Sequence, residues 1–215
     1  MEDTTIRVII ITGTPGVGKT TVATELAKSL SSNVLDVSEL VQKENLVSMS
    51  DDRRETLIAD MKKLRTRVRG ILAKTKDSIV IEGHYAYDVV PKPTNTMTFV
   101  LRRDPDDLEQ KLRKRGYDDR KISENIAAEV LDVCLIGAIR RLGKDRLHEI
   151  DVTHSDVGTV VNEILEVLNG KREPASGKID WIAKLEAEGK LENFLSSTVR
   201  VEGIEYGHLA GDSET

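Results

Sequence analysis

The chain has 215 residues, of which 39% are apolar, 32% are charged and 3% are aromatic, and its formal net charge is −5. The substantial apolar fraction and the mixed charge exclude an intrinsically disordered protein, and the length suits one domain with a small appendage. A mildly acidic chain does not favour non-specific binding to nucleic acid, so we expect no DNA partner. No apolar run approaches the roughly 20 residues of a membrane span, and the one cysteine, Cys134, allows no internal disulfide. We therefore expect a cytoplasmic protein without a membrane partner.

The first 170 residues alternate between strand and helix patterns. Residues 6–12 read IRVIIIT, a continuous β-branched run that is typical of a strand buried on both faces of a parallel sheet. Residues 19–30 then carry apolar side chains at helical spacing. In chain order, the remaining predicted elements are strand 33–37, a helix capped by Ser38 that runs to Asn45, a long helix 51–76, strand 78–82, strand 96–101, a helix capped by Asp104 that ends near Arg115, a second long helix 122–142, strand 147–152 and helix 156–168. This alternation predicts an α/β fold with a parallel sheet, helices on both faces, and ligands at the carboxyl ends of the strands.

The composition changes after Gly170, which is expected to stop the last helix of this domain. Residues 171–178 read KREPASGK and are predicted to form a linker, and residues 179–189 are predicted to form a short helix that Trp181 anchors onto the domain. Residues 211–215 are expected to be disordered. The predicted organisation is one domain over residues 1–170, followed by a C-terminal extension over residues 171–215 that is partly helical and then disordered.

Residues 13–20 read GTPGVGKT and match the phosphate-binding pattern G-x-x-x-x-G-K-[ST] at every fixed position. The buried strand before this P-loop and the amphipathic helix after it are the context that the pattern requires. Its glycines allow successive N–H groups to point at phosphate oxygens, its lysine reaches the β- and γ-phosphates, and its threonine hydroxyl ligates Mg²⁺. We therefore expect ATP with Mg²⁺ to bind. The residues expected to contact the nucleotide are Gly13, Gly16, Gly18, Lys19, Thr20 and Thr21.

Two further candidates follow the third predicted strand. Glu82 ends this apolar strand, as a second carboxylate facing the metal of a P-loop would, so it is expected to hold Mg²⁺ with Thr20 or to position the nucleophile. His84, two residues later, could orient the attacking water or hydroxyl, and a purely structural histidine is an equal alternative.

Arginines supply positive charge to the transferred phosphoryl group in many phosphoryl-transfer enzymes. Arg115 is the preferred candidate because Gly116 follows it at a helix–helix joint, where a closing lid would lie. Arg102, Arg103 and Arg113 are weaker candidates, each with a surface charge as the alternative. The predicted catalytic residues are Lys19, Glu82, His84 and Arg115, and the predicted metal ligands are Thr20 and Glu82.

Taken together, these segments resemble the adenylate kinase isoenzyme 6 family over about residues 7–168. The resemblance rests on GTPGVGKTT at residues 13–21, DVSEL at residues 36–40, the acid-x-His of Glu82 and His84, LRRDP at residues 101–105, and RGY with a later ENxxxE. It implies a P-loop NTPase of the nucleoside monophosphate kinase type, a three-layer α/β/α fold with a five-stranded parallel sheet.

The resemblance also implies functional parts. Residues 37–56 correspond to a mobile segment that binds the nucleoside monophosphate, and residues 114–124 correspond to a short lid that brings Arg115 to ATP. Members of this family are described as having adenylate kinase and ATPase activity. They act in maturation of the small ribosomal subunit, where they bind a platform ribosomal protein near pre-rRNA. AMP is the implied acceptor.

Two departures from the pattern leave the activity open. The family's strand-three acid is usually Asp, and the extra methylene of Glu82 moves the carboxylate by about 1.5 Å, whereas a misplacement of about 1 Å can cost roughly 10²-fold in rate. Ordinary adenylate kinases also carry an arginine for the AMP phosphate after this strand, whereas here Gly83 is followed by His84, Tyr85 and Ala86. The chain is therefore predicted to be an adenylate-kinase-like enzyme, with a slow ATPase that remodels a ribonucleoprotein as the alternative and a non-catalytic binding module as a third.

Overall fold

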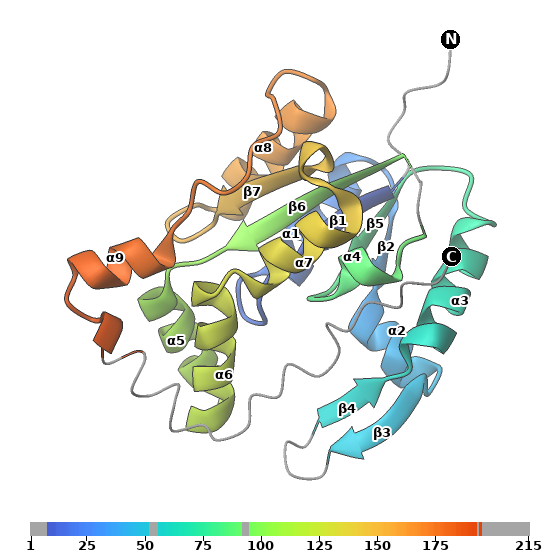
Figure 1. Ribbon diagram of the computed structural model, residues 1–215. Coiled ribbons are helices and arrows are strands. Elements are labelled where there is room, and N and C mark those ends of the chain that lie inside the picture. Colours follow the sequence, from blue (N-terminus) through green and yellow to red (C-terminus); the bar gives the residue numbers. More distant parts are fainter. Residues whose placement is uncertain (1–7, 52–55, 92–94, 193, 195–215) are drawn as a thin grey trace.

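The computed structural model describes residues 8–51, 56–91, 95–192 and 194 (Figure 1). Its centre is a five-stranded sheet with the strand order β2-β5-β1-β6-β7, in which all neighbouring strands are parallel. The strands are β1 (Val8–Thr12), β2 (Asn33–Asp36), β5 (Ile79–Glu82), β6 (Thr96–Arg102) and β7 (Leu147–Asp151). The predicted α/β class and five-stranded parallel sheet are confirmed.

Helices cover both faces of this sheet (Figure 1). They are α1 (Lys19–Ser29), α2 (Val37–Lys43), α3 (Met61–Leu72), α4 (Ala86–Val89), α5 (Pro105–Lys114), α6 (Asp119–Val130), α7 (Val133–Leu142), α8 (Val157–Leu168) and α9 (Trp181–Ala187). Successive side chains of a strand point to opposite faces. Ile9 and Ile11 of β1 accordingly pack in one apolar cluster with α1, α5 and α8. Val8 and Ile10 pack in the other, with α2, α3 and α4. The three-layer α/β/α architecture follows from this division.

The predicted long helix over residues 51–76 is wrong. Instead, β3 (Val47–Asp51) and β4 (Thr56–Ala59) form an antiparallel pair, and only Met61–Leu72 is helical, as α3. The helix begins there because Asp60 Oδ1 accepts a hydrogen bond from the N–H of Lys63 and so caps the first turn. Helical spacing in the charged sequence did not reveal the strand pairing, which joins residues from Asp51 and Thr56 out to Val47 and Ala59.

The second predicted long helix, over residues 122–142, is also wrong, since it is divided into α6 and α7. The chain turns between them at Asp132, whose φ of 56° is left-handed. This conformation is uncommon for a residue other than glycine. The side chain of Asp132 accepts a hydrogen bond of 2.5 Å from Arg102 Nη2, which ties the turn to the end of β6. This long-range contact is invisible to helical periodicity.

Two smaller differences lie near the sheet's carboxyl edge. The cap of α2 is Asp36 rather than Ser38, because Asp36 Oδ1 accepts from the N–H groups of Ser38 and Glu39. The sequence analysis also did not predict the short helix α4. The predicted disorder of residues 211–215, the first two residues of strand 6–12 and residues 52–55 lie outside the described residues.

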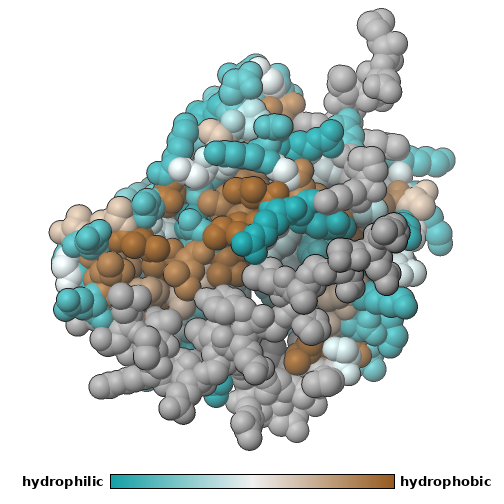
Figure 2. Space-filling model, in the orientation of Figure 1, coloured by the Kyte–Doolittle hydropathy of each residue, from teal (hydrophilic) through white to brown (hydrophobic). Residues whose placement is uncertain are grey.

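The C-terminal helix α9 is the short helix that was predicted around Trp181, and it packs beside α6. Trp181 is 6% exposed and shares an apolar cluster with Val130 and Leu185, so its anchoring role is confirmed. Figure 2 shows apolar residues gathering over α7 and α9 on this face of the molecule. Within the described residues, none of the helices has the length and apolar character needed to cross a membrane.

Two glycines inside helices offer a matched test of the packing. A Cβ at Gly137 in α7 would lie 2.3 Å from Tyr87 Oη and 2.7 Å from Tyr87 Cζ, whereas a Cβ at Gly70 in α3 would meet no atom within 4 Å. We expect Gly137→Ala to lower the free energy of unfolding by about 1–3 kcal/mol. Gly70→Ala should raise it by up to about 1 kcal/mol through helix propensity. Urea denaturation measures both, and equal effects would contradict the packing of α4 on α7.

Candidate active site

The P-loop connects the end of β1 to the start of α1 and lies at the carboxyl ends of the parallel strands. Gly13 has a φ of 140°, and a Cβ there would lie 2.4 Å from the carbonyl oxygen of Leu101 in β6. A Cβ at Gly16 would lie 2.8 Å from Leu112 Cδ2 in α5. Only glycine permits this backbone conformation and this close approach to the neighbouring elements. Glycine at these two positions therefore permits the tightly curved loop that the P-loop pattern predicts around phosphate.

Lys19 and Thr20, the first residues of α1, place their side chains at this cradle. Lys19 Nζ donates hydrogen bonds to the carbonyl oxygens of Gly13 at 2.9 Å and Thr14 at 3.1 Å. Burial lowers the pKa of Lys19, and the carboxylates of Glu82 and Glu129 oppose this effect. The ammonium group therefore lies along the loop, where it can neutralise phosphate charge.

Glu82, at the carboxyl end of β5, is 3% exposed and accepts a hydrogen bond of 2.7 Å from Thr20 Oγ1. Burial raises the pKa of Glu82 above its usual range, and the nearby negative charge of Asp36 adds to this shift. The hydroxyl and the carboxylate present hard oxygen atoms side by side, which is the donor set that Mg²⁺ prefers together with phosphate and water. The chain's own oxygens thus fit the predicted metal, although within the described residues no group of three or more His, Cys, Asp or Glu side chains is arranged so that it could hold a metal ion by itself.

Asp36 was not predicted as a site residue. It ends β2, which pairs with β5 so that Asp36 lies beside Glu82 in the register. An acid at the end of a strand was a visible signal, but only the strand order shows that the two carboxylates are neighbours. This pairing places a second acid next to the predicted metal ligand.

A cleft of about 330 Å³ collects most of the predicted residues. Its lining residues are Pro15, Gly16, Gly18, Lys19, Thr20, Thr21, Asp36, Ser38, Glu82, Gly83, His84, Arg115 and Tyr117. The structure thus brings the predicted Glu82, His84 and Arg115 to the P-loop, while Gly13 lies behind it against β6. Ser38 and Tyr117 join Asp36 as lining residues that sequence reasoning missed.

His84 is exposed to the cleft, and its main chain is fixed from two sides. Its carbonyl oxygen accepts hydrogen bonds from Thr12 Oγ1 at 3.0 Å and from Cys134 Sγ at 3.6 Å. Its ring and the ring of Tyr85 are nearly perpendicular, at 87°, with 4.2 Å between the ring centroids. Desolvation by the walls of the cleft, reinforced by the charge of Lys19, lowers the pKa of His84 below its usual range. The imidazole is therefore neutral at pH 7 and able to accept a hydrogen bond from a water or hydroxyl.

A second cleft, of about 380 Å³, lies on the other side of the P-loop and shares Gly16, Gly18, Thr21 and Arg115 with the first. Its remaining lining residues are Val17, Val22, Arg103, Lys111, Lys114, Val152, Ser155, Val157 and Val160. Cations thus share this cleft with apolar side chains from α8 and from Val152, which follows β7. This combination suits a ligand with a negative chain and a flat apolar ring, as a nucleoside triphosphate has.

The other candidate arginines have different surroundings. Arg102 is 1% exposed and forms ion pairs with Glu129, Asp132 and Glu149, so it faces the interior rather than a cleft. Arg113 is held on the surface by Glu109 and Asp119. Arg103 lines the second cleft while its side chain pairs with Asp107 and donates to the carbonyl oxygen of Val17.

Comparisons with known proteins agree with this geometry. A family described as "AAA domain" matches residues 9–132. A protein of Methanocaldococcus jannaschii named "Putative adenylate kinase" is 39% identical over 176 residues, which are 82% of this chain and 93% of that protein. A protein of Methanococcus maripaludis with the same name is 34% identical over 180 residues, covering 81% and 95%.

Among solved structures, shikimate kinase from Acinetobacter baumannii in complex with shikimate matches with a TM-score of 0.57 and 14% identity, covering 78% of this chain and 96% of that one. At this identity the likeness concerns the fold, which is that of a P-loop NTPase. The matches cover nearly the whole length of these two relatives, and both relatives carry the same name. The chain therefore belongs to an adenylate-kinase-like family of P-loop proteins.

Proposed function

We propose that this protein is an ATP-dependent nucleoside monophosphate kinase, with AMP as its first candidate acceptor. The observation that carries the proposal is the cleft that Lys19 of the P-loop lines together with Thr20, Glu82 and Asp36. Phosphoryl transfer requires this combination of a cation for the phosphates and oxygen ligands for their metal. The name "Putative adenylate kinase" of the matched relatives supports the same class of substrate.

In the proposed reaction, an oxygen of the monophosphate attacks the γ-phosphorus of ATP, and the bond from that phosphorus to the β–γ bridging oxygen breaks. Lys19 neutralises charge on the β- and γ-phosphates from one side. Arg115, at the end of α5, lines the same cleft and would neutralise further charge on these phosphates. Thr20 and Glu82 would hold the Mg²⁺, which when bound offsets the phosphate charge. The products are two nucleoside diphosphates.

The proposal assigns two movable parts. Residues 37–56, which include α2 and β3, would bind the monophosphate, and residues 114–124, between α5 and α6, would form the lid. Figure 1 shows the β3–β4 pair standing away from the main sheet beside α2, a placement that would let it close over an acceptor. Residues 1–170 would form the kinase domain, with residues 171–215 as its extension.

The test of the kinase proposal is an assay of the purified protein with Mg-ATP, with and without AMP, in which chromatography resolves the products. We expect AMP to disappear and two ADP to form for each ATP consumed. Glu82→Gln should slow this conversion by about 10²-fold, because it removes the charge that holds the metal. Consumption of ATP at the same rate without AMP would refute the kinase proposal.

A slow ATPase is the second candidate, and the composition of the cleft favours it. Among the described residues that line the 330 Å³ cleft, the lysine and arginine side chains are those of Lys19 and Arg115, and both lie beside the P-loop. The acceptor side presents Asp36, Ser38 and Tyr117 instead. Arg53 and Arg54, which could hold a monophosphate, lie outside the described residues.

His84 distinguishes these two candidates. If the imidazole orients an attacking water, His84→Ala should abolish the loss of ATP in the absence of AMP. If the protein is a kinase whose acceptor is held elsewhere, the same variant should keep AMP-dependent formation of ADP. Phosphate release and ADP formation, measured in parallel, give the answer.

The role in small-subunit maturation, with a platform ribosomal protein and pre-rRNA as partners, stays a prediction from the family resemblance. Co-purification of small-subunit precursors with the tagged protein would support it. A non-catalytic binding module remains the third alternative, and it would require that the protein bind no ATP.

A further inference from the structure

Glu129, in α6, is a buried carboxylate at which three parts of the chain meet. Its side chain is 1% exposed. Oε2 accepts a hydrogen bond of 2.5 Å from the hydroxyl of Thr14 in the P-loop. Oε1 accepts from Arg102 Nε at 2.8 Å, from the main-chain N–H of Arg103 at 3.0 Å and from Trp181 Nε1 at 3.1 Å. The P-loop, the end of β6 and the C-terminal helix α9 therefore share one charged group.

We propose that Glu129 and Trp181 are positioning residues for the P-loop. Through them, the helix α9 helps to hold the P-loop in the conformation that binds the nucleotide. This inference rests on the proposed function, since it concerns how the same P-loop binds its nucleotide. Neither residue lines the two clefts, and both act through the hydroxyl of Thr14, which is 1% exposed.

The segment that leads to Trp181 is fixed to the sheet by its own hydrogen bonds. Glu149 Oε2 accepts from the N–H groups of Gly177 at 2.8 Å and Lys178 at 3.1 Å, while Oε1 pairs with Arg102. Ala175 donates its N–H to His148 Nδ1 at 3.0 Å and accepts from the N–H of Glu149 at 2.8 Å. Residues 175–181 thus supply hydrogen-bond donors to the buried carboxylates of Glu149 and Glu129. A buried polar network of this kind holds a defined geometry only when all its members are satisfied.

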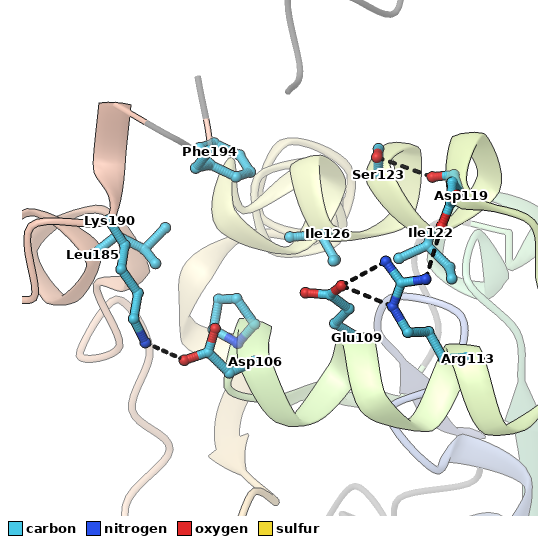
Figure 3. Close-up of a pocket in the computed structure, with 11 residues that line it drawn as sticks. Asp106, Glu109, Arg113, Asp119, Ile122, Ser123, Ile126, Leu185, Lys190 and Phe194 are labelled. Carbon is cyan, nitrogen blue, oxygen red and sulfur yellow. Dashed lines mark hydrogen bonds and ion pairs between the residues drawn. The ribbon is translucent and has the colours of Figure 1, made fainter. Parts of the chain in front are cut away.

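The helix α9 also holds α5, the element that brings Arg115 to the cleft. Lys184 pairs with Asp104 at 2.7 Å and Lys190, which follows α9, pairs with Asp106 at 2.5 Å. Figure 3 shows Lys190 reaching across to Asp106 at the start of α5. The same C-terminal segment therefore contacts the P-loop through Glu129 and the lid side of the cleft through α5.

The expected effect is on nucleotide affinity. Trp181→Phe keeps an aromatic ring in the cluster but removes the N–H donor to Glu129, so the carboxylate and the Thr14 hydroxyl shift. Substitutions along such a coupled chain typically change binding by roughly 2- to 30-fold. Leu185→Ala is the matched control, because it removes apolar contact on the same helix and leaves the indole N–H in place.

A double-mutant cycle tests the connection without reference to catalysis. Thr14→Val removes the hydroxyl that Glu129 accepts from, and Thr14→Ser retains it. In urea denaturation, the effects of Thr14→Val and Trp181→Phe should fail to add, because both act on one carboxylate. Thr14→Ser should restore additivity. Additive effects of Thr14→Val and Trp181→Phe would overturn the proposal.

The fluorescence of the wild-type protein gives a second readout, because Trp181 is the one tryptophan in the sequence. Saturating Mg-ATP should change its emission, and Thr14→Val should abolish that change at a saturation verified by equilibrium dialysis. The proposal would be overturned if bound Mg-ATP leaves the emission of Trp181 unchanged, or if it changes the emission equally in the wild type and in Thr14→Val. If dialysis shows that Mg-ATP does not bind the wild type, the proposed function fails, while the denaturation cycle still decides this inference.

Discussion

Replacing Lys19 with alanine is expected to reduce transfer of the γ-phosphate by about 10²–10³-fold, the usual loss when one preorganised donor to a developing charge is removed. The ammonium group lies within hydrogen-bonding distance of the carbonyl oxygens of Gly13 and Thr14, at the mouth of the P-loop. No other lysine lines the 330 Å³ cleft among the residues that the structure describes. Without Lys19, Arg115 is the remaining lysine or arginine among the described residues that line this cleft.

Lys28→Ala provides the matched control for this prediction. Lys28 lies on the same helix α1, pairs with Glu25 and has a side chain that is 67% exposed. We expect this variant to retain wild-type turnover and stability, since exposed pairs contribute little. Product chromatography measures turnover, and circular dichroism verifies that both variants are folded. Near wild-type turnover in Lys19→Ala would refute the assignment of this lysine.

Arg102→Leu is expected to have the largest effect on stability, about 3–5 kcal/mol, because it breaks a buried ion-pair network by removing one partner. The guanidinium donates to Glu129 at 2.8 Å, to Glu149 at 2.5 Å and to Asp132 at 2.5 Å. Without it, two almost fully buried carboxylates would lose their main cationic partner, and the left-handed turn at Asp132 would lose its anchor. Urea denaturation should show this loss as a large fall in the midpoint.

Arg113→Leu is the comparison for this second prediction. Arg113 also pairs with two carboxylates, Glu109 and Asp119, but its side chain is 55% exposed. The expected change in the free energy of unfolding is within about 0.5 kcal/mol. If the two leucine variants are equally stable, burial of the Arg102 network is not what holds β6, α6 and β7 together.

Much of the sheet and of the P-loop could be predicted because local patterns determine them. The run of residues 8–12 is apolar at nearly every position, and the glycines and Lys19 of the P-loop stand at fixed spacing within ten residues. Glu82 and His84 were also found, since they follow a clearly apolar strand. These features need no knowledge of which elements are neighbours.

The remaining features depend on long-range contacts. The strand order that sets Asp36 beside Glu82 joins residues far apart in the sequence. The turn at Asp132 is held by Arg102, 30 positions earlier. Arg102 itself was considered for phosphate binding because an arginine after a strand suggests it, and its burial among three acids could not be read from the pattern. Tertiary partners decided each of these positions.

The place of β1 in the sheet has a consequence for synthesis of the chain. Val8 pairs with Ile79 on one side and with Thr96 on the other, so β1 gains its neighbours only when β5 and β6 exist. Such non-local pairing is slow to form. A fragment that ends before residue 79 contains the whole P-loop sequence but lacks Glu82 and both neighbours of β1. The cleft at the carboxyl end of β1 can therefore be complete only after the chain has been synthesised through β6, so a nucleotide that binds this cleft would stabilise the protein from that point on.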